Sequence, residues 1–483
     1  MIDVFPFAHY PVAVFGLGRS GLSAAKALKN SKAEVEAWDD DPRARSDASD
    51  EELELVDLYK CNWKDHSTLV LSPGIPLYYP KPHKIVQLAR AENVEVIGEI
   101  ELLARTQREA AYIGITGTNG KSTTTAMIGH IMQIAGREVE IGGNLGVPSL
   151  ELAPMGQDGT YVLEMSSFQL DLTKSITFDV AVLLNISPDH LDRHGGMEGY
   201  VKSKKSIFHR QTKPRTAIIG VDDEICQVIF EELAAADEQV VIAVSGHKKV
   251  FGGVYVINGT LIDDTEGLET PVMDLKGNPC LAGQHNWQNT AASYATAKSI
   301  GIQSHVIMAC INSYPGLVHR QEPVAIIDGV GYINDSKATN GEAASKALAC
   351  YDAIYWIVGG RPKEGGLFAT KEYLSNVRHA FIIGEASMEF SKFLDGSVPL
   401  TLSGDIKTAV SMASKMAKEE AEVKKTFPIV LLSPAASSFD QFKNFEVRGD
   451  TFRDLVEEIP GQQTDPFEKP WIFSETLLDE GIE

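Results

Sequence analysis

A glycine-rich segment in the first third of the chain has the residue types of a loop that binds phosphate. It runs Gly114-Ile115-Thr116-Gly117-Thr118-Asn119-Gly120-Lys121-Ser122, overlaps a strand candidate at Tyr112–Ile115 and precedes residues with helical spacing. In such a loop glycines let backbone N–H groups converge on anionic oxygens, a lysine neutralises the terminal phosphates and a hydroxyl binds Mg²⁺. The glycines stand at 114 and 117, whereas the usual spacing places one at 115, so the motif is a variant. The alternative is a glycine-rich turn with an incidental lysine; the strand before and the helix after favour phosphate binding.

Polar side chains accompany two further strand candidates, at Tyr161–Met165 and Val180–Leu184. The first contains Glu164, and the second is followed by Asp189 and His190. Ligands of open α/β sheets bind beyond the carboxyl ends of the strands, and hard cations prefer oxygen donors. These side chains would therefore hold Mg²⁺ next to the phosphate loop. In the alternative interpretation, Asp189 and Asp192 cap a helix and His190 packs locally.

A second glycine-rich turn lies near the N-terminus. Gly16-Leu17-Gly18-Arg19-Ser20-Gly21 follows a strand candidate at Val12–Phe15, and Asp39 ends the next strand candidate, Val35–Trp38. This pattern is typical of NAD-binding sites, in which the acid binds a ribose, but the same geometry suits any nucleotide diphosphate. A tight strand-to-helix turn without a ligand is the third interpretation.

Other polar clusters are less specific. Lys202, Lys204 and Lys205 read by themselves as a solvated basic face. Asn286 and Asn289 share one helix face and would contact a base or a phosphate, or else mark a helix start. The segments Asp335–Asn340 and Ser433–Ser438 follow strand candidates, so they are either substrate-binding loops or capped turns.

The elements that position these residues alternate between strand and helix, which predicts an α/β fold with parallel sheets. The expected strands of the last third are Ala325–Ile327, Ile354–Val358, Ala380–Ile383 and Ile429–Leu432, and Asn258-Gly259 signals a hairpin. At about 150 residues per domain, 483 residues predict three domains.

Composition excludes several classes of protein. There are 66 acidic and 44 basic side chains, a net charge of -22, which disfavours binding to nucleic acid or to an anionic membrane. The five cysteines form no CxxC pair, so we expect reduced thiols in a cytoplasmic protein rather than a zinc site. No apolar run approaches the roughly 18 residues of a membrane span, and the N-terminal residues lack a basic region typical of a secretion signal.

Taken together, the motifs resemble those of the Mur ligase family. GITGTNGKST, LEMSSFQLD, NISPDHLDRHG, AGQHNWQN, the pair His319-Arg320, NDSKATN and SPAASSFDQFKNFEVRG occur in the order that Mur ligases carry them. The resemblance extends from about residue 12 to 456. TGTNGKST alone would also fit folylpolyglutamate synthases. The N-terminal turn and the last two motifs narrow the resemblance to members that add D-glutamate.

The resemblance implies three α/β domains and a tail. A Rossmann-like domain, residues 1–98, would bind the UDP group, and a central P-loop ATPase-like domain with a mainly parallel sheet, residues 99–318, would bind ATP. A C-terminal Rossmann-like domain, residues 319–461, would bring in the amino acid, and residues 462–483 would form an acidic tail. The implied protein is a cytoplasmic monomer of peptidoglycan precursor synthesis, without nucleic-acid or membrane partners.

The implied reaction joins D-glutamate to UDP-N-acetylmuramoyl-L-alanine, with ATP and Mg²⁺ as cofactors. A carboxylate is a poor electrophile, so it would first accept the γ-phosphoryl group, and the amine would then displace phosphate. Catalysis of phosphoryl transfer rests on positioning and charge neutralisation.

The resemblance also implies roles for individual residues. Lys121, Glu164, His190 and Lys204 would be catalytic, with Ser122, Glu164, His190 and a carbamylated Lys204, in Tyr200-x-x-x-Lys204, placing magnesium. The implied ATP contacts are Gly117, Thr118, Asn119, Gly120, Lys121, Ser122, Thr123, Asn286, Asn289, Arg320, Asp335 and Lys337. The implied UDP-substrate contacts are Gly16, Leu17, Gly18, Arg19, Ser20, Asp39, Gly74 and Asn144. D-glutamate would contact Thr339, Lys363, Ser438 and Phe445, with Arg361 as an alternative to Lys363.

Three alternatives stay open on the sequence. One is another Mur-type or folylpolyglutamate-type amino-acid ligase. Another is a nicotinamide-dependent oxidoreductase, predicted from the first glycine-rich turn and Asp39. The last is a scaffold that binds nucleotide without turnover.

Overall fold

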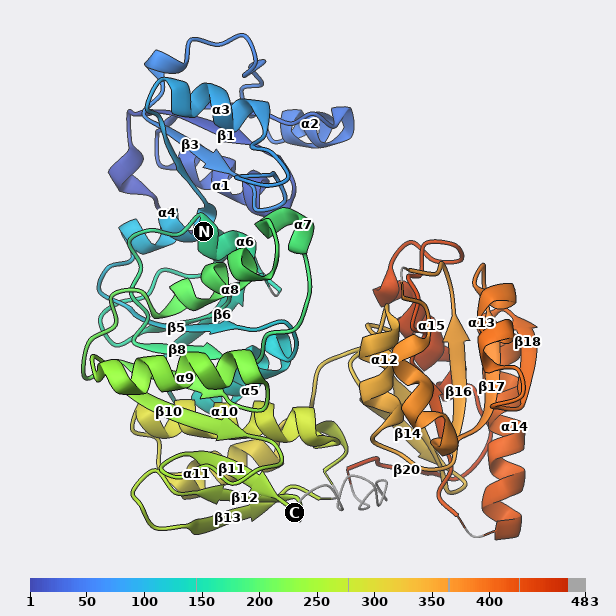
Figure 1. Cartoon of the computed structure of the whole chain (residues 1–483). Helices are drawn as coiled ribbons and strands as arrows, with labels where there is room; N and C mark the ends of the chain where they lie inside the picture. Colours follow the sequence, from blue (N-terminus) through green and yellow to red (C-terminus); the bar gives the residue numbers. More distant parts are fainter. Residues whose placement is uncertain (145, 277, 364, 425, 468–483) are drawn as a thin grey trace.

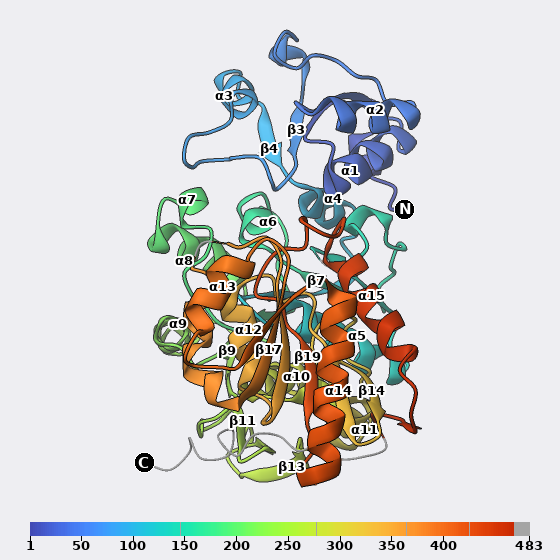
Figure 2. The ribbon, with the colours of Figure 1, turned by 90° about the vertical axis from the view of Figure 1, so that its right-hand side faces the viewer.

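Three β-sheets follow one another along the chain in a computed structural model that describes residues 1–144, 146–276, 278–363, 365–424 and 426–467. We call the parts built on them the first, central and third units. Figure 1 shows the first unit stacked on the central unit and the third unit standing beside the central one. In the view of Figure 2 the third unit lies in front of the central unit. The predicted α/β class with large, mainly parallel sheets is confirmed.

The first unit has a four-stranded, wholly parallel sheet in the order β2-β1-β3-β4. Helix α1 begins at Arg19, inside the glycine-rich turn, and Gly18 occupies its N-cap position in an extended conformation. The elements are β1 (Pro11–Phe15), α1 (Arg19–Asn30), β2 (Glu34–Trp38), α2 (Pro42–Asp50), β3 (Thr68–Leu71), α3 (Lys84–Ala91), β4 (Glu95–Ile97) and then α4 (Glu99–Thr106).

The central unit has a nine-stranded sheet in the order β13-β12-β11-β10-β9-β8-β5-β7-β6. Strands from β6 to β11 pair in parallel, and the predicted hairpin at Asn258-Gly259 joins the antiparallel pair β11 and β12. The strands are β5 (Ala111–Thr116), β6 (Val139–Gly143), β7 (Thr160–Glu164), β8 (Val180–Leu183), β9 (Thr216–Gly220), β10 (Val240–Ser245), β11 (Val254–Ile257), β12 (Thr260–Asp263) and β13 (Thr270–Asp274). The helices are α5 (Lys121–Ile134), α6 (Ser167–Asp171), α7 (Leu191–His194), α8 (Met197–Lys205), α9 (Glu224–Ala236), α10 (Gln284–Ser299) and α11 (Ser304–Asn312).

The third unit has a seven-stranded sheet in the order β18-β17-β16-β19-β15-β14-β20. Its first five strands in that order are parallel, whereas β14 and β20 are antiparallel additions at one edge. The strands are β14 (Glu322–Ile327), β15 (Val330–Asn334), β16 (Ile354–Gly359), β17 (Val377–Ile383), β18 (Leu400–Gly404), β19 (Ile429–Leu432) and β20 (Gln463–Thr464). The helices are α12 (Gly341–Leu348), α13 (Ser387–Leu394), α14 (Ile406–Lys424) and α15 (Phe445–Glu457).

Continuous apolar runs place the inner strands in the core. All residues of β3, β8, β16 and β19 are buried, as expected for parallel strands covered on both faces. The polar residues that follow such strands therefore emerge at the sheet edge, where the predicted site lies. Within the described residues, we find no helix that is both long and apolar enough to span a membrane.

Candidate functional site

The loop between β5 and α5 has the backbone that phosphate binding requires. Gly117 and Gly120 adopt φ of +154° and +82°, which residues with side chains rarely do. The Lys121 ammonium donates to the carbonyl oxygens of Gly117 (2.9 Å) and Thr118 (2.8 Å). Burial lowers the pKa of Lys121, and the nearby Glu164 carboxylate opposes that shift. The lysine therefore lies over the loop, at the N-terminus of a 14-residue helix.

Replacement of Gly120 by alanine should disrupt this loop. A Cβ at this position would overlap Oδ1 of the buried Asn289, whose Nδ2 donates to Asn286 Oδ1 (3.3 Å). The left-handed backbone alone costs about 1–2 kcal/mol with a side chain present. We expect Gly120→Ala to weaken ADP binding by about 10-fold or more, measured by titration calorimetry.

Gly136→Ala is the matched control for this variant. Gly136 follows α5 with φ +72°, and no atom outside its immediate surroundings lies within 4 Å of the point that a Cβ would occupy. It carries the same backbone strain away from the loop, so its ADP affinity should equal that of the parent protein. Equal affinities of the two variants would contradict the role given to Gly120.

Glu164, the last residue of β7, lies beside the strand that leads into the phosphate loop, where the sequence predicts an oxygen donor for magnesium. Its side chain is buried, and Oε1 accepts a hydrogen bond from Asn144 Nδ2 (2.7 Å). Oε2 is buried without a hydrogen-bond partner among the described residues. Across the loop, Ser122 Oγ accepts from the Arg320 guanidinium (2.9 Å). The orphaned carboxylate oxygen and the serine hydroxyl are both of the hard-oxygen type that Mg²⁺ prefers.

The side chain of Lys204, on α8, points toward the phosphate loop. Its side chain is 1% exposed, and Nζ donates to the carbonyl of Gly117 (2.7 Å) and lies 4.7 Å from the centre of the Tyr200 ring. Burial, and then repulsion from Lys121, lower the pKa of Lys204 to about 7. The solvated-face interpretation is therefore wrong for Lys204. Helical geometry turns this residue inward, whereas Lys202 is exposed.

His190 lies at the rim of this cluster. It is the N-cap residue of α7 with φ +51°, its side chain is 51% exposed, and its ring lies 5.1 Å from that of Phe168. No side chain makes a capping hydrogen bond there, so the interpretation of Asp189 and Asp192 as helix caps is wrong. In the part of the chain that the structure describes, no hydrogen bond or ion pair joins His190 to Glu164.

A cavity of about 480 Å³ opens between the phosphate loop and the third unit. Of the predicted ATP contacts, those that line it are Asn119, Gly120, Thr123, Asn286, Asn289, Arg320, Asp335 and Lys337. Sequence reasoning missed further lining residues, among them Asp222, His247, His285 and Gln288. Asp222 lies beyond the end of β9, and His285 and Gln288 belong to the motif AGQHNWQN. A polar residue after a strand and membership of this motif are both features of the sequence that could have indicated these residues. A larger depression around Arg105 and Arg215 contains none of the predicted site residues.

In the third unit the structure brings two of the predicted amino-acid contacts, Thr339 and Lys363, together. Lys363 Nζ donates to Thr339 Oγ1 (3.2 Å), and Lys337 Nζ lies 4.0 Å from the centre of the Phe445 ring. Ser438 is buried. Asp335 is also buried; it accepts from Ser433 Oγ (2.8 Å), and burial raises its pKa to about 7.

Arg361, the alternative carboxylate partner, is already engaged. Its guanidinium forms an ion pair with Glu385, with Nε 3.0 Å from Oε2. Lys363 can bind a ligand carboxylate without first breaking an ion pair, because among the described residues its ammonium contacts only the neutral hydroxyl of Thr339.

The first glycine-rich turn faces the central unit. Asp39 closes it: Oδ2 accepts from the Leu17 amide (2.6 Å) and Oδ1 from the Asp41 amide (2.8 Å). Arg19 donates across the junction to the carbonyl of Gly146, close to Asn144. Gly16, Gly18 and Ser20 lie in or beside this turn, and Gly74 lies in the turn after β3. Because both Asp39 oxygens bind backbone amides, the carboxylate is poorly placed to bind the ribose of a dinucleotide.

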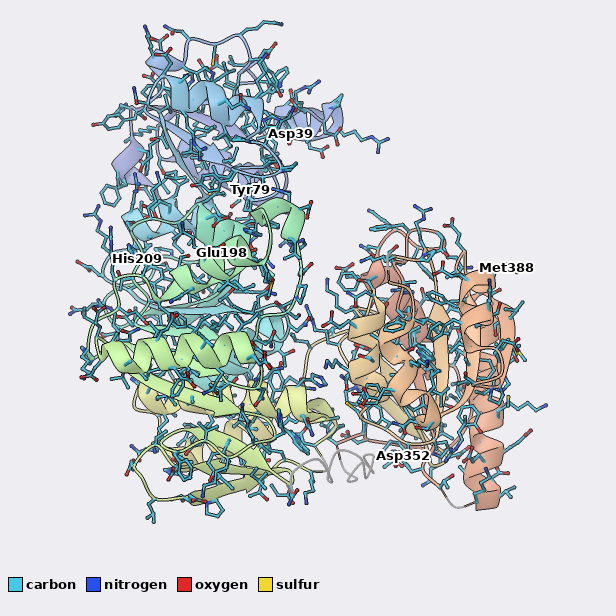
Figure 3. All side chains as sticks on the ribbon, viewed as in Figure 1. Asp39, Tyr79, Glu198, His209, Asp352 and Met388 are labelled. Carbon is cyan, nitrogen blue, oxygen red and sulfur yellow. The ribbon has the colours of Figure 1, made fainter. Side chains whose placement is uncertain are left out.

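Tyr79 forms a second contact between the first and central units. A Cβ on Gly195, where φ is +71°, would lie 2.6 Å from Cζ of the Tyr79 ring. Gly195 directly follows α7, the helix whose N-cap residue is His190. Figure 3 shows Tyr79 on the side of the first unit that faces α7. The contact therefore links the first unit to the turn that carries His190.

Comparison with known proteins matches this geometry to one family. Residues 115–297, which include the phosphate loop, Glu164 and Lys204, match the model of the Mur ligase middle domain. A UDP-N-acetylmuramoylalanine–D-glutamate ligase from Caulobacter sp. (strain K31) is 49% identical over 94% of this chain and 98% of its own length. A protein of the same name from Rhodospirillum rubrum is 46% identical over 95% of this chain and 97% of its own.

The chain belongs to the Mur ligase family. Members of this family are ATP-dependent ligases. Two Mur-type structures share the fold at low identity. A pseudomurein peptide ligase type C from Methanothermus fervidus superimposes with a TM-score of 0.54 and 20% identity, covering 93% of this chain and 100% of its own. UDP-N-acetylmuramate-alanine ligase from Thermotoga maritima gives a TM-score of 0.55 and 16% identity, covering 93% and 99%.

Proposed function

We propose that this Mur ligase joins the amine of D-glutamate to the L-alanine carboxylate of UDP-N-acetylmuramoyl-L-alanine, with ATP converted to ADP and phosphate. The observation that carries the proposal is the 43–49% identity, over 94–96% of the chain, to proteins named for that reaction. The site supplies the chemistry: a phosphate loop, a buried carboxylate with a free oxygen and a buried lysine beside it.

In this proposal the residues of the central unit neutralise and position the reacting anions. The Lys121 ammonium binds the β- and γ-phosphates, which stabilises the charge on the phosphoryl group during its transfer to the alanine carboxylate. Ser122, Glu164 and His190 would hold magnesium, whose charge would offset that of the phosphates. Transfer gives an acyl phosphate and ADP. The amine of D-glutamate then attacks the carbonyl carbon, loses a proton, and the phosphate leaves.

We propose that the Lys204 amine reacts with CO₂ to give a carbamate. The nitrogen lone pair bonds to the carbon of CO₂, and one proton leaves to solvent, so the side chain changes from a cation to an oxygen donor. A pKa of about 7 supports this step, because much of the amine is then neutral and nucleophilic near neutral pH. A carbamate would suit a magnesium site, where an ammonium would repel the ion.

The outer units would supply the other two substrates. We propose that Gly16–Ser20, Gly74 and Asn144 contact the UDP substrate, with Asp39 shaping the turn. Thr339, Lys363 and Phe445 would contact D-glutamate, with Ser438 supporting them from within. The proposed domain limits are 1–98, 99–318 and 319–461, except that β20 (Gln463–Thr464), inside the predicted tail, pairs with β14 and so belongs to the sheet of the third unit. Of the tail at 462–483, residues 468–483 lie outside the described residues. A monomer acting in the cytoplasm, without nucleic-acid or membrane partners, completes the proposal.

Phosphate release tests the proposed function directly. The protein is incubated with ATP, Mg²⁺ and UDP-N-acetylmuramoyl-L-alanine, and D-glutamate is compared with L-glutamate, L-lysine and meso-diaminopimelate. Release with D-glutamate alone is the expected result. Release with another amino acid would keep the mechanism but overturn the D-glutamate pocket. ADP binding without release in any mixture would favour a scaffold, and NADH binding without ATP binding would favour an oxidoreductase.

The contact between Tyr79 and Gly195 should matter for turnover. Gly195→Ala is expected to reduce kcat about 10-fold, because the new Cβ pushes the Tyr79 ring and the turn that carries His190 apart. Steady-state phosphate release measures the effect. In a Tyr79→Ala background the same substitution meets no ring, so its additional effect should shrink to that of backbone strain. An undiminished effect in the double variant would show that the ring contact plays no part.

A further inference from the structure

Three metal-binding side chains meet in the first unit, away from the phosphate loop. Glu36 lies in the middle of β2, and Cys61 and His66 lie on the connection between α2 and β3. One ligand atom from each residue lies within 4.8 Å of the other two. His66 Nε2 and Glu36 Oε2 lie 2.9 Å apart. The chain spacing of these residues gives no zinc signature, so only the fold brings them together.

The connection that carries Cys61 and His66 is held firmly in place. Its residues 54–56 run beside β2, with the Ala37 amide donating to Glu54 and the Val56 amide to Ala37. Trp63, which lies between Cys61 and His66 in the chain, is buried and donates from Nε1 to the Leu58 carbonyl (3.2 Å). The His66 ring lies 5.3 Å from the Trp63 ring. The donors therefore stand on a fixed frame and would not have to be gathered from a loose loop.

Apart from the contact between His66 and Glu36, the ligand atoms of the cluster are weakly held. The His66 side chain is 3% exposed, Nε2 is the ring nitrogen that meets Glu36, and Nδ1 has no hydrogen-bond partner among the described residues. The Cys61 thiol hydrogen-bonds to the Leu58 carbonyl at 3.5 Å, a long and weak contact. Glu36 is about one-third exposed, which leaves a path for an ion from solvent.

We propose that Glu36, Cys61 and His66 form a binding site for a borderline-soft divalent ion, of which Zn²⁺ is the physiological candidate. A thiolate, an imidazole and a carboxylate are the three ligand types that Zn²⁺ takes in proteins, and water would complete a tetrahedron. At the usual bond lengths the donors of such an ion stand about 3.3–3.8 Å apart. Side-chain adjustments of about 1 Å would reach that geometry.

The ligand types favour an ion of this type over Mg²⁺, which prefers oxygen donors to thiolate and imidazole, and the charges also balance. Binding removes the thiol proton to solvent, so a thiolate and a carboxylate together neutralise the two positive charges. The ion would then fasten the connection at residues 54–67 to the edge strand β2 and stabilise the first unit.

Cobalt spectroscopy tests the site without relying on turnover. The full-length reduced protein is titrated with Co²⁺ in excess Mg²⁺, which occupies oxygen-donor sites such as the one near Glu164. We expect a near-ultraviolet thiolate-to-cobalt charge-transfer band that Zn²⁺ abolishes. Cys61→Ser should remove the band. Cys310→Ala, which alters another free cysteine, should retain it.

Affinity and stability measurements complete the test. His66→Gln and Glu36→Gln should weaken Co²⁺ binding about 100-fold or more, because loss of even an outer hydrogen-bond partner of a metal ligand costs 10–100-fold. Zn²⁺ should raise the Tm of the parent protein and of Cys310→Ala but not of Cys61→Ser, with folding checked by circular dichroism. Absence of the band, or a band that persists in Cys61→Ser, would overturn the proposal. Failure of the metal-site proposal would not affect the proposed ligase reaction, because that reaction is measured separately, by phosphate release.

Discussion

Lys121→Ala is expected to lower the rate of phosphate release by about 10³-fold or more, with the fold intact. The ammonium lies over the loop carbonyls at the start of α5, where the phosphates of ATP are proposed to bind. Loss of one positioned group that stabilises transition-state charge costs about 10²–10³ in rate, and loss of a full cation in phosphoryl transfer costs up to about 10⁵. Steady-state phosphate release with all substrates present measures the effect.

Binding measurements separate this effect from misfolding. Affinity for UDP-N-acetylmuramoyl-L-alanine should stay unchanged in Lys121→Ala, because the first unit is proposed to hold most of that substrate. Lys202→Ala, which removes an exposed lysine from α8, should retain full activity. Full activity in Lys121→Ala would refute the assignment of the phosphate loop.

Lys204→Ala should reduce turnover by about 10²-fold or more, through loss of a magnesium-positioning group. The parent protein should in addition depend on dissolved CO₂. The pKa of Lys204 is about 7, so the amine is mainly protonated below pH 7 and mainly neutral above it. Only the neutral amine forms a carbamate. Activity of CO₂-depleted protein should therefore be low, and bicarbonate should restore it with a requirement that rises as pH falls below 7.

The alanine variant provides the control for this dependence. Lys204→Ala has no amine to carbamylate, so its residual activity should not respond to bicarbonate at any pH. Lys202→Ala should respond as the parent protein does. A parent protein that keeps full activity after thorough CO₂ removal, with no carbamate detected by ¹³C NMR, would exclude the carbamate.

Much of the fold could be predicted from the sequence because buried parallel strands are continuous apolar runs. The strand at Ile429–Leu432 begins and ends where the pattern places it, and Asn258-Gly259 forms the hairpin that its residue types predict. Local sequence patterns do not predict strand pairings that depend on contacts between distant segments. The antiparallel edge at β14 and β20 depends on a pairing between residues more than 130 positions apart, which local periodicity does not encode.

In the candidate site, too, some features follow from contiguous residues and others depend on long-range packing. The phosphate loop follows from one segment, because its glycines, lysine and serine act through their own backbone and its helix. The burial of Lys204 and its hydrogen bond to Gly117 do not follow from a basic stretch, since they need α8 to lie against a loop 87 residues earlier. The role of Asp39 in closing the first glycine-rich turn also does not follow from the local sequence. Both carboxylate oxygens accept hydrogen bonds from backbone amides, which disfavours the dinucleotide-binding interpretation.

The sequence by itself determined the α/β class, the phosphate loop, the resemblance to Mur ligases and the polar loops that follow the strands. These are properties of contiguous residues, where spacing fixes the geometry. Only the tertiary structure decided which lysine of α8 is buried, that Tyr79 touches the turn carrying His190, and that Glu36, Cys61 and His66 converge. Each of these depends on long-range packing, which sets the distance between atoms far apart in the chain and the exposure of each charge to water.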